Sequence, residues 1–178
     1  TEDELRMILA NFTIQLYQQS GGTVVSDDLL LEGKSDITNN DVFNNLIRDL
    51  LGNIDVSKIA LTNIQTALNS KVQLAPLEDT LGFVYISLRD LSHRKQTGAY
   101  YTPQKTVNTL ICNLKNCVKA HNKTLCDPCC GTGNFLIGLV ENGVKIENLY
   151  GQDIDEISIL ITRINMFLLD NSITKDQL

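Results

Sequence analysis

The sequence of 178 residues predicts an α/β fold in which an all-helical N-terminal part precedes a βαβα unit. Three observations predict it. Apolar residues keep helical spacing through about the first 90 positions, two short apolar runs further on are typical of buried strands, and a glycine-rich turn, Gly131-Thr132-Gly133, follows the first of these runs. We therefore expect two domains, residues 1–95 and residues 96–178.

Four helices are expected in the first domain. The first opens at a capping box, Thr1-Glu2-Asp3-Glu4, and the second is capped by Asn40 or Thr38 and ends at Gly52. A third runs from about residue 56 to 69 and a fourth follows Pro76, with a loop and a possible short extended piece in residues 23–37. The expected buried faces are Leu5, Ile8, Leu9, Phe12 and Leu16; Val42, Phe43, Leu46, Ile47, Leu50 and Leu51; Ile59, Ala60, Ile64, Ala67 and Leu68; and Leu77, Leu81, Val84, Tyr85, Leu88 and Leu91.

From residue 102 onward the sequence predicts strands as well as helices. Thr102 as N-cap and Pro103 as first helical residue predict a helix whose buried face carries Val107, Leu110, Ile111, Leu114 and Val118. A strand at 124–126, the glycine turn, a helix to about Glu141 and a strand at about 148–152 follow. A last helix carries Ile157, Leu160, Ile161, Ile164 and Leu168. Two strands joined through a helix are expected to be parallel.

Composition excludes several classes of protein. No apolar run approaches the roughly 20 residues that a membrane helix needs, and no signal peptide is recognisable. The net charge of −6 lacks the overall basic footprint of a nucleic-acid binder, so contact with DNA must be local or supplied by another domain or subunit. The local basic group is Arg89, Arg94, Lys95 and Lys105, with His93 beside them, and a solvated loop is the simpler explanation for it. A first residue Thr rather than Met suggests an excised segment.

Five cysteines lie between Cys112 and Cys130, inside apparently regular elements. This crowding is unlike a disulfide framework and favours a reducing, cytoplasmic setting. Cys126 and Cys129, together with Cys117 and His121, could form a zinc site, but a second C-x-x-C pair is missing. We therefore expect small buried thiols and no metal.

The glycine turn and a later aspartate suggest a nucleotide-like cofactor, although Gly-x-Gly alone also fits a plain turn at a helix start. Exposed amides at that helix start would favour a polar or anionic group. Asp153 follows the second strand 22 residues after Gly131. Because parallel strands end at the same edge of a sheet, its carboxylate should face the turn and accept hydrogen bonds from two ribose hydroxyls. Asp155 is interpreted mainly as a helix cap. A dinucleotide-binding dehydrogenase is disfavoured, because Leu136 stands where the third glycine belongs.

Three sequence blocks then resemble a known family. Gly98-Ala99-Tyr100-Tyr101-Thr102-Pro103, Asp127-Pro128-Cys129-Cys130-Gly131-Thr132-Gly133-Asn134-Phe135-Leu136 and Tyr150-Gly151-Gln152-Asp153-Ile154-Asp155 are similar, in that order, to the first three blocks of the adenine-N6 DNA methyltransferases. The likeness is greatest to the modification subunit of type I restriction systems and to the fused type IIG enzymes. Asp79-Thr80-Leu81-Gly82-Phe83-Val84-Tyr85 resembles the helical preface of that family.

The resemblance implies a doubly wound, Rossmann-like domain that binds S-adenosylmethionine. By position, Thr102 and Pro103 would line the methionine end, and Asp127 would face the ammonium group. The glycines would pass under the ribose and the methionine, Asp153 would hold the ribose and Ile154 would flank the adenine. Tyr100 and Tyr101 could equally be packing residues. The implied cofactor-binding set is Tyr101, Thr102, Pro103, Asp127, Cys129, Gly131, Gly133, Asp153 and Ile154.

Two blocks of the family are missing from the sequence, an acidic residue after a third strand, which contacts the adenine of the cofactor, and a loop that holds the target base. The family holds the flipped target adenine with an (Asn/Asp)-Pro-Pro-(Tyr/Phe) loop, whereas Pro76, Pro103 and Pro128 are the only prolines here. The chain therefore resembles the N-terminal part of a DNA methyltransferase without catalytic residues, expected to bind the cofactor weakly or not at all and to be inactive alone. The parent would act on DNA, with a possible specificity or restriction subunit as partner. A methyltransferase acting on RNA or protein, or a helical partner-docking module, remain the alternatives.

Overall fold

The computed structural model describes residues 1–25, 36–73, 78–89, 101–114 and 123–174. The chain divides into two compact units, Thr1–Leu74 and Ala75–Leu178. The domain boundary expected at residues 95 and 96 lies outside the described residues, and that domain division stays a prediction. The division into compact units comes earlier because helix α5 (Thr80–Leu88) packs against helix α10 (Glu156–Leu169) of the second unit.

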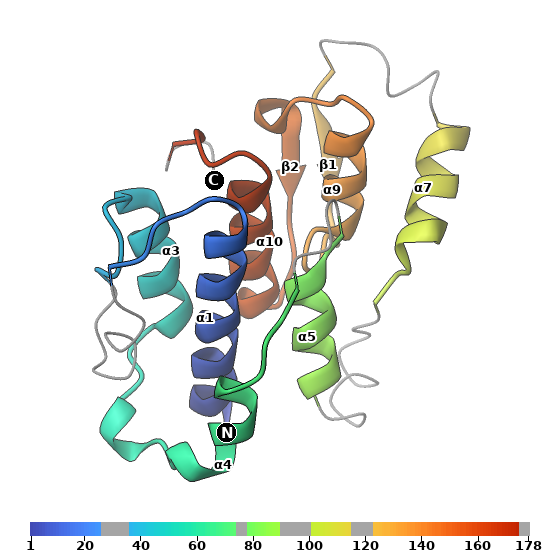
Figure 1. The fold of residues 1–178 in the computed structure, drawn as a ribbon. Helices are drawn as coiled ribbons and strands as arrows, with labels where there is room; N and C mark the ends of the chain where they lie inside the picture. The colour runs from blue at the N-terminus through green and yellow to red at the C-terminus, as the bar shows by residue number, and fades with distance from the viewer. Residues whose placement is uncertain (26–35, 74–77, 90–100, 115–122, 175–178) are drawn as a thin grey trace. The chain divides into compact units, whose positions relative to one another are not determined.

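The first unit is helical, as expected. Helix α1 (Glu2–Gln19) begins at a complete capping box formed by Thr1 and Glu4, which confirms the prediction. Helix α3 (Asp41–Leu51) lies alongside α1 (Figure 1), is capped by Asn40 and ends at Gly52. The rings of Tyr17 and Phe43 stack between these two helices, with centroids 3.9 Å apart. All the apolar positions expected to be buried on the two helices are buried except Leu5 and Val42.

The third expected helix is divided, and the prediction of one continuous helix is wrong. A 3-10 turn, η1 (Val56–Lys58), is followed by helix α4 (Leu61–Leu68), which packs against α1. The Asp55 carboxylate accepts from the Ser57 amide, and Ile59 then adopts an extended conformation that breaks the helix. Of the expected face, Ile59 and Ile64 are buried, whereas Ala60 is exposed.

A short extended piece does occur near residue 24. Val24 and Thr38 form an isolated antiparallel bridge, and the Val25 amide donates to the Ile37 carbonyl. Residues 26–35, which complete the expected loop, lie outside the described residues.

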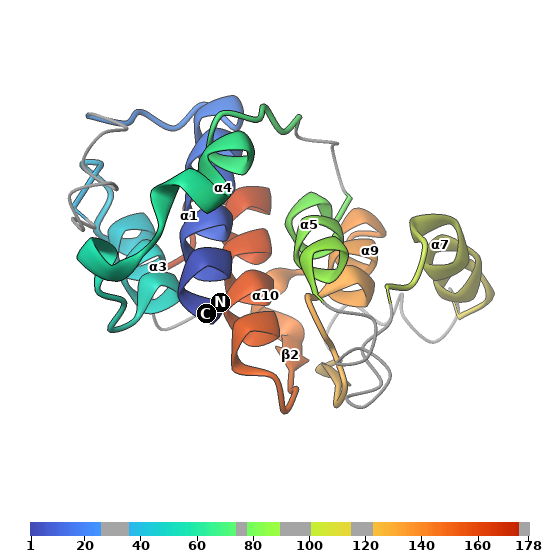
Figure 2. The same ribbon diagram turned by 90° about the horizontal axis from the view of Figure 1, so that it is seen from below.

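The second unit contains the expected βαβα order. Strand β1 (Leu125–Asp127) leads through helix α9 (Asn134–Glu141) and the 3-10 turn η2 (Ile146–Asn148) to strand β2 (Leu149–Gly151) and then to α10. The strands are parallel, with Asp127 opposite Gly151, so both end at the same edge. Helix α10 packs against α9 and α5, and helix α7 (Gln104–Asn113) packs against α9. Figure 2 shows α10, α5, α9 and α7 in this order from left to right. The described part of this unit is therefore mostly helical, with a two-stranded parallel sheet.

Helices α5 and α7 differ from their predictions in detail. On α5, Leu81 and Tyr85 are buried but Leu88 is exposed, and the expected Leu77 and Leu91 lie outside the described residues. Pro103 occupies the N-cap position of α7 without a side-chain cap, so the expected Thr102 cap is wrong. Since Pro103 has an extended backbone, regular helix starts only at the next residue.

The buried face of α7 is narrower than expected. Val107 and Ile111 are buried, facing Gly138 of α9, while Leu110 and Leu114 are exposed and Val118 lies outside the described residues. Within the described ranges, no helix combines the length and the apolarity needed to cross a membrane.

Candidate functional site

The glycine turn joins the end of β1 to the start of α9. Gly131 and Gly133 have φ angles of 54° and 88°, in the left-handed region where glycine is favoured. A Cβ at Gly133 would lie 3.0 Å from Cγ2 of Thr162, whereas a Cβ at Gly131 would have no heavy atom within 4 Å. The turn is therefore packed on α10 at Gly133 and open at Gly131.

The end of β2 holds the turn through backbone and side-chain bonds. The Gln152 amide donates to the Asp127 carbonyl, and the Cys130 amide donates to the Gln152 carbonyl, both at 2.9 Å. The Gly131 amide donates to Oδ2 of Asp153 at 2.8 Å. The Asp153 carboxylate thus faces the glycine turn, as the spacing in the sequence predicts. That this carboxylate accepts hydrogen bonds from ribose hydroxyls stays a prediction.

Helix α10 holds the same turn with polar side chains that we did not identify from the sequence. Thr162 Oγ1 donates to the Gly131 carbonyl at 2.9 Å, and Asn165 Nδ2 donates to the Thr132 carbonyl at 2.8 Å. Both side chains are buried. Together with buried Ser158 they occupy one face of a helix whose other buried residues are apolar, with spacings of four and three residues. That polar stripe is the signal that could have revealed them.

A buried carboxylate from α5 completes the support of the turn. Asp79, the N-cap of α5, accepts on Oδ1 from the Gly82 amide and from Asn165 Nδ2, each at 2.7 Å. Its Oδ2 is hydrogen-bonded to Thr132 Oγ1. We call Asp79, Gly82, Thr132 and Asn165 the Asp79 cluster. It joins α5, the glycine turn and α10 inside the second unit.

The environment of Asp79 disfavours its charge. The side chain is fully buried, and among the described residues its hydrogen-bond partners are neutral and no cation pairs with it. Burial raises the pKa of the Asp79 carboxyl above its ordinary value of 3.8, and the three hydrogen bonds oppose this only in part. Carboxyl groups whose pKa is raised by burial are enriched at functional sites, and this one lies beside a candidate site.

We expect Asp79→Asn to change the pH dependence of stability. Because the pKa of Asp79 is higher in the folded than in the unfolded chain, the wild type loses stability as pH rises from about 4 through the raised pKa. The asparagine of the variant cannot titrate, and its amide can still bond to the Thr132 hydroxyl. The variant should therefore gain stability over the wild type with rising pH until a plateau is reached.

Urea unfolding at a series of pH values measures this difference. Glu141→Gln, which neutralises an exposed carboxylate at the far end of α9, is the control and should leave the pH profile unchanged. A stability difference between the Asp79→Asn variant and the wild type that is the same at every pH would contradict the burial of a titrating carboxyl.

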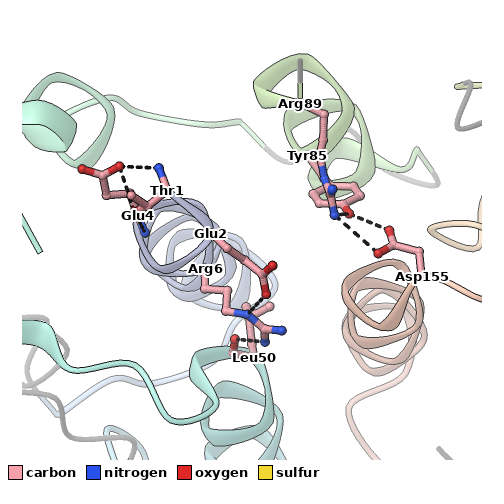
Figure 3. A network of polar contacts seen from close by, with 8 residues as sticks. All are labelled: Thr1, Glu2, Glu4, Arg6, Leu50, Tyr85, Arg89 and Asp155. Atoms are coloured by element: carbon pink, nitrogen blue, oxygen red, sulfur yellow. Dashed lines mark hydrogen bonds and ion pairs between the residues drawn. The ribbon is translucent and has the colours of Figure 1, made fainter. Parts of the chain in front are cut away.

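A second polar group links α5 to the start of α10 (Figure 3). Tyr85 Oη donates to Asp155 Oδ2 at 2.5 Å, and Arg89 contacts both Tyr85 Oη and Asp155 Oδ1, the latter at 3.4 Å. Burial and the Asp155 carboxylate raise the pKa of Tyr85, so its hydroxyl remains a donor. Arg89, expected on a solvated loop, is instead an ion-pair partner inside the unit.

Asp155 occupies the N-cap position of α10 but does not cap it in the expected way. Its carboxylate accepts from the Ser158 hydroxyl at 2.6 Å, and no side-chain bond reaches a backbone amide of the helix. The prediction of Asp155 as the N-cap is thus correct in position. Its carboxylate does not bond to a helix amide, because Oδ2 accepts from the hydroxyls of Tyr85 and Ser158 instead.

Two further candidate residues, Tyr101 and Thr102, lie in the segment before α7. Asn134 Nδ2 donates to the Thr102 carbonyl, which ties the segment before α7 to the first residue of α9. The ring of Tyr101 meets Phe83 edge-on at 5.7 Å, and burial together with the charges of Asp79 and Glu78 raises the pKa of Tyr101 to about 12. Tyr100 lies outside the described residues.

Asp127 is the last residue of β1, and Ile154 follows the end of β2. Ile154, next to Asp153, has 93% of its surface exposed. Asp127 Oδ1 accepts from the Cys129 amide at 3.1 Å, which closes a local turn after β1.

The cysteines are not uniformly buried as expected. Cys130 is buried against Gly151, and burial raises the pKa of its thiol to about 11, whereas Cys112, Cys126 and Cys129 are exposed. Among the described residues no cluster of histidine, cysteine and acidic side chains could hold a metal ion. Cys117 and His121 of the possible zinc set lie outside them.

The anion site expected at the first amides of α9 stays a prediction, but four amides of the turn before that helix are already hydrogen-bonded. Those of Cys129 and Gly131 donate to Asp127 and Asp153, and those of Cys130 and Gly133 donate to backbone carbonyls. Three carboxylates, of Asp79, Asp127 and Asp153, instead bond to the turn. The electrostatics of this turn therefore suit a cationic or zwitterionic ligand better than a phosphate.

Comparison with known proteins gives the family. The model of the family described as N-6 DNA Methylase matches residues 77–178, a range that includes the Asp79 cluster, the glycine turn and Asp153. The Type II methyltransferase M.VspI of Vibrio sp. (strain 343) is 42% identical over 84 residues, which cover 47% of this chain. The matched part spans only 20% of that relative. No solved structure matches the chain. The chain belongs to the N-6 DNA methylase family.

Proposed function

We propose that this chain forms part of the S-adenosylmethionine site of an adenine-specific DNA methyltransferase of a restriction-modification system. The observation that carries the proposal is the acidic glycine turn at the common end of two parallel strands, with Asp153 bonded to Gly131. Membership of the family supports DNA as the substrate and does not favour the RNA and protein alternatives. The doubly wound Rossmann-like sheet, a specificity or restriction subunit as partner and a cytoplasmic setting stay predictions.

The residues at the turn fit this cofactor. S-adenosylmethionine carries a sulfonium and an ammonium cation, and the carboxylates of Asp127 and Asp153 border the turn that we propose it crosses. Gly131 leaves its backbone uncovered for close approach. No side chain caps α7 after Pro103, so its first amides can bind the cofactor carboxylate. Ile154 offers an exposed apolar side chain for the adenine.

When bound, the cofactor supplies a methyl group activated by its positive sulfur. The part of the chain described here would bind and orient it: Asp153 accepts from the ribose hydroxyls, Asp127 from the ammonium, and Tyr101 with Thr102 and Pro103 borders the methionine end. Cys129, exposed beside Asp127, completes the proposed binding set. Asp153 would exchange at least one of its present bonds, to the Gly131 and Asp155 amides, for the ribose.

The chain by itself is proposed to transfer no methyl group. Its sequence contains no Pro-Pro pair and hence no loop of the kind that holds a flipped adenine. We expect the part of the site present here to retain weak cofactor binding, because the Asp79 cluster and α10 already order the turn.

Titration of the ¹⁵N-labelled chain with S-adenosylhomocysteine tests the proposal. We expect progressive shifts of the amide resonances of Gly131, Gly133 and Asp153. Asp153→Asn should weaken binding at least tenfold, since it loses charge-assisted bonds to the ribose. Glu141→Gln is the matched control for the loss of one negative charge and should bind as the wild type does.

Two results would count against this reading of the site. Binding that Asp153→Asn leaves unchanged would remove the ribose assignment, and shifts confined to other elements would place the ligand elsewhere. Methylation of DNA by the isolated chain would contradict the proposed lack of activity.

A further inference from the structure

The buried carboxylate of Asp79 lies directly behind the glycine turn. It bonds to the side chain of Thr132, between the two glycines, and its other donors are the Gly82 amide and the Asn165 amide group. These donors are neutral, and the described residues provide no cation to compensate the charge. Water does not reach the side chain, whose exposed surface is 0%. Its field is consequently screened much less than that of a surface carboxylate.

The opposite side of the turn is open. Gly131, the neighbour of Thr132, has no heavy atom within 4 Å of the position of a Cβ. Asp79 is therefore separated from this open side by the turn itself. Asp127 and Asp153 also contribute charge there, but both are half-buried, and in our proposal they bind the ligand directly. Asp79 cannot touch a ligand on the open side and can act on it only through its charge.

We infer that Asp79, in its ionised form, is a specificity-determining residue whose negative charge favours the sulfonium of S-adenosylmethionine over the neutral thioether of S-adenosylhomocysteine. The inference rests on the proposed function. In methyl transfer the carbon–sulfur bond breaks with its electron pair remaining on sulfur, while the acceptor nitrogen forms the new carbon–nitrogen bond and gives up a proton. The ligand sulfur thus loses its positive charge, and the attraction of Asp79 disappears with it. Asp79 would in this way favour substrate binding and product release together.

A purely structural role for Asp79 makes a different prediction. If Asp79 only holds the turn by hydrogen bonds, a change that disturbs the turn weakens both ligands equally. Asp79→Asn preserves the shape and the bonding capacity of the side chain and removes the charge. Asp79→Ser is a second neutral variant that retains a good helix N-cap for the Gly82 amide.

The test compares the affinities of two ligands in each variant. The ¹⁵N-labelled wild-type chain, Asp79→Asn, Asp79→Ser and the control Glu141→Gln are titrated with S-adenosylmethionine and with S-adenosylhomocysteine. The pH is the one at which the stability difference between the wild type and Asp79→Asn has reached its plateau, so that Asp79 is ionised. Sinefungin, whose protonated amine replaces the methylsulfonium, serves as a second cation that cannot transfer a methyl group. We expect the preference for either cation over the thioether to fall about tenfold in both Asp79 variants. The control should keep the wild-type preference.

Each result is decisive. An equal loss of affinity for the three ligands in the Asp79 variants, or no loss at all, would overturn the charge role while leaving the proposed cofactor site intact. Failure of all three ligands to shift the turn resonances of the wild-type chain would overturn the proposed function and this inference with it. The spectra without ligand show whether each variant is folded, and one folded neutral variant is sufficient for the comparison.

Discussion

Replacing Gly82 with alanine is expected to lower the free energy of unfolding of the second unit by about 3 kcal/mol. A Cβ at this position would lie 2.0 Å from Oδ2 of Asp79 and 2.2 Å from Oγ1 of Thr132. Both atoms are buried and bonded to each other, so neither can move without breaking the cluster. The gain of about 1 kcal/mol in helix propensity from glycine to alanine is too small to offset this.

The measurement is urea unfolding followed by tyrosine fluorescence. The sequence has five tyrosines and no tryptophan, and Tyr17 is the only tyrosine in the first unit, so a Tyr17→Phe background restricts the signal to the second unit. Gly138→Ala is the matched control, because its Cβ would meet the side-chain tips of Ile111 and Val107 at 2.7 and 2.8 Å. These tips can shift, and a loss of about 1 kcal/mol is expected. A smaller loss for Gly82→Ala than for Gly138→Ala would contradict the tight packing of the cluster.

At pH values above the raised pKa of Asp79, where its carboxyl is ionised, replacing Thr132 with valine should cost about 2 kcal/mol of stability. The two side chains have nearly the same shape, but valine removes the hydroxyl that bonds to the buried Asp79 carboxylate. A hydrogen bond to a charged group contributes roughly 1.5–3 kcal/mol, compared with about 1 kcal/mol for a neutral pair. The same unfolding experiment in the Tyr17→Phe background measures the loss.

Thr162→Val is the control for this substitution. It removes an equivalent hydroxyl, but one that donates to the neutral Gly131 carbonyl, and should cost about 1 kcal/mol. The cost of Thr132→Val should also fall in the Asp79→Asn background, because the neutral asparagine has no charge for the Thr132 hydroxyl to stabilise. Equal losses for the two valine variants, unchanged by Asp79→Asn, would show that Thr132 does not solvate a charge.

The sequence predicts the elements of the second unit because their signals are local. Apolar spacing defines α9 and α10, and the rule that parallel strands end at one edge brings Asp153 to Gly131 correctly. The error at α7 is also local: Pro103 is suited to a first helical turn, but here its extended backbone makes it the N-cap. The third helix is divided at Ile59, after a 3-10 turn that Asp55 caps, and periodicity does not detect such a cap.

The supporting residues of the site could not be predicted in the same way. Asp79 looks like an ordinary helix cap in the sequence, and it is one, since it accepts from the Gly82 amide. Its additional bonds to Thr132 and Asn165 depend on how three distant segments pack. Thr162 and Asn165 appear in the sequence only as polar interruptions of an apolar helix, and nothing local states what they bond to. The partial site found from the sequence is accordingly the part made by one βαβ unit.

The bonds of the Asp79 cluster also bear on how the protein folds. They join Asp79 to Thr132 across 53 positions and to Asn165 across 86, whereas the turn itself spans only a few residues. Contacts between such distant positions require large loops to close first, so they form late and slow the search for the native state. We therefore expect the glycine turn to acquire its final geometry only when α5 and α10 have docked, which in a nascent chain requires that residues near 165 have been synthesised.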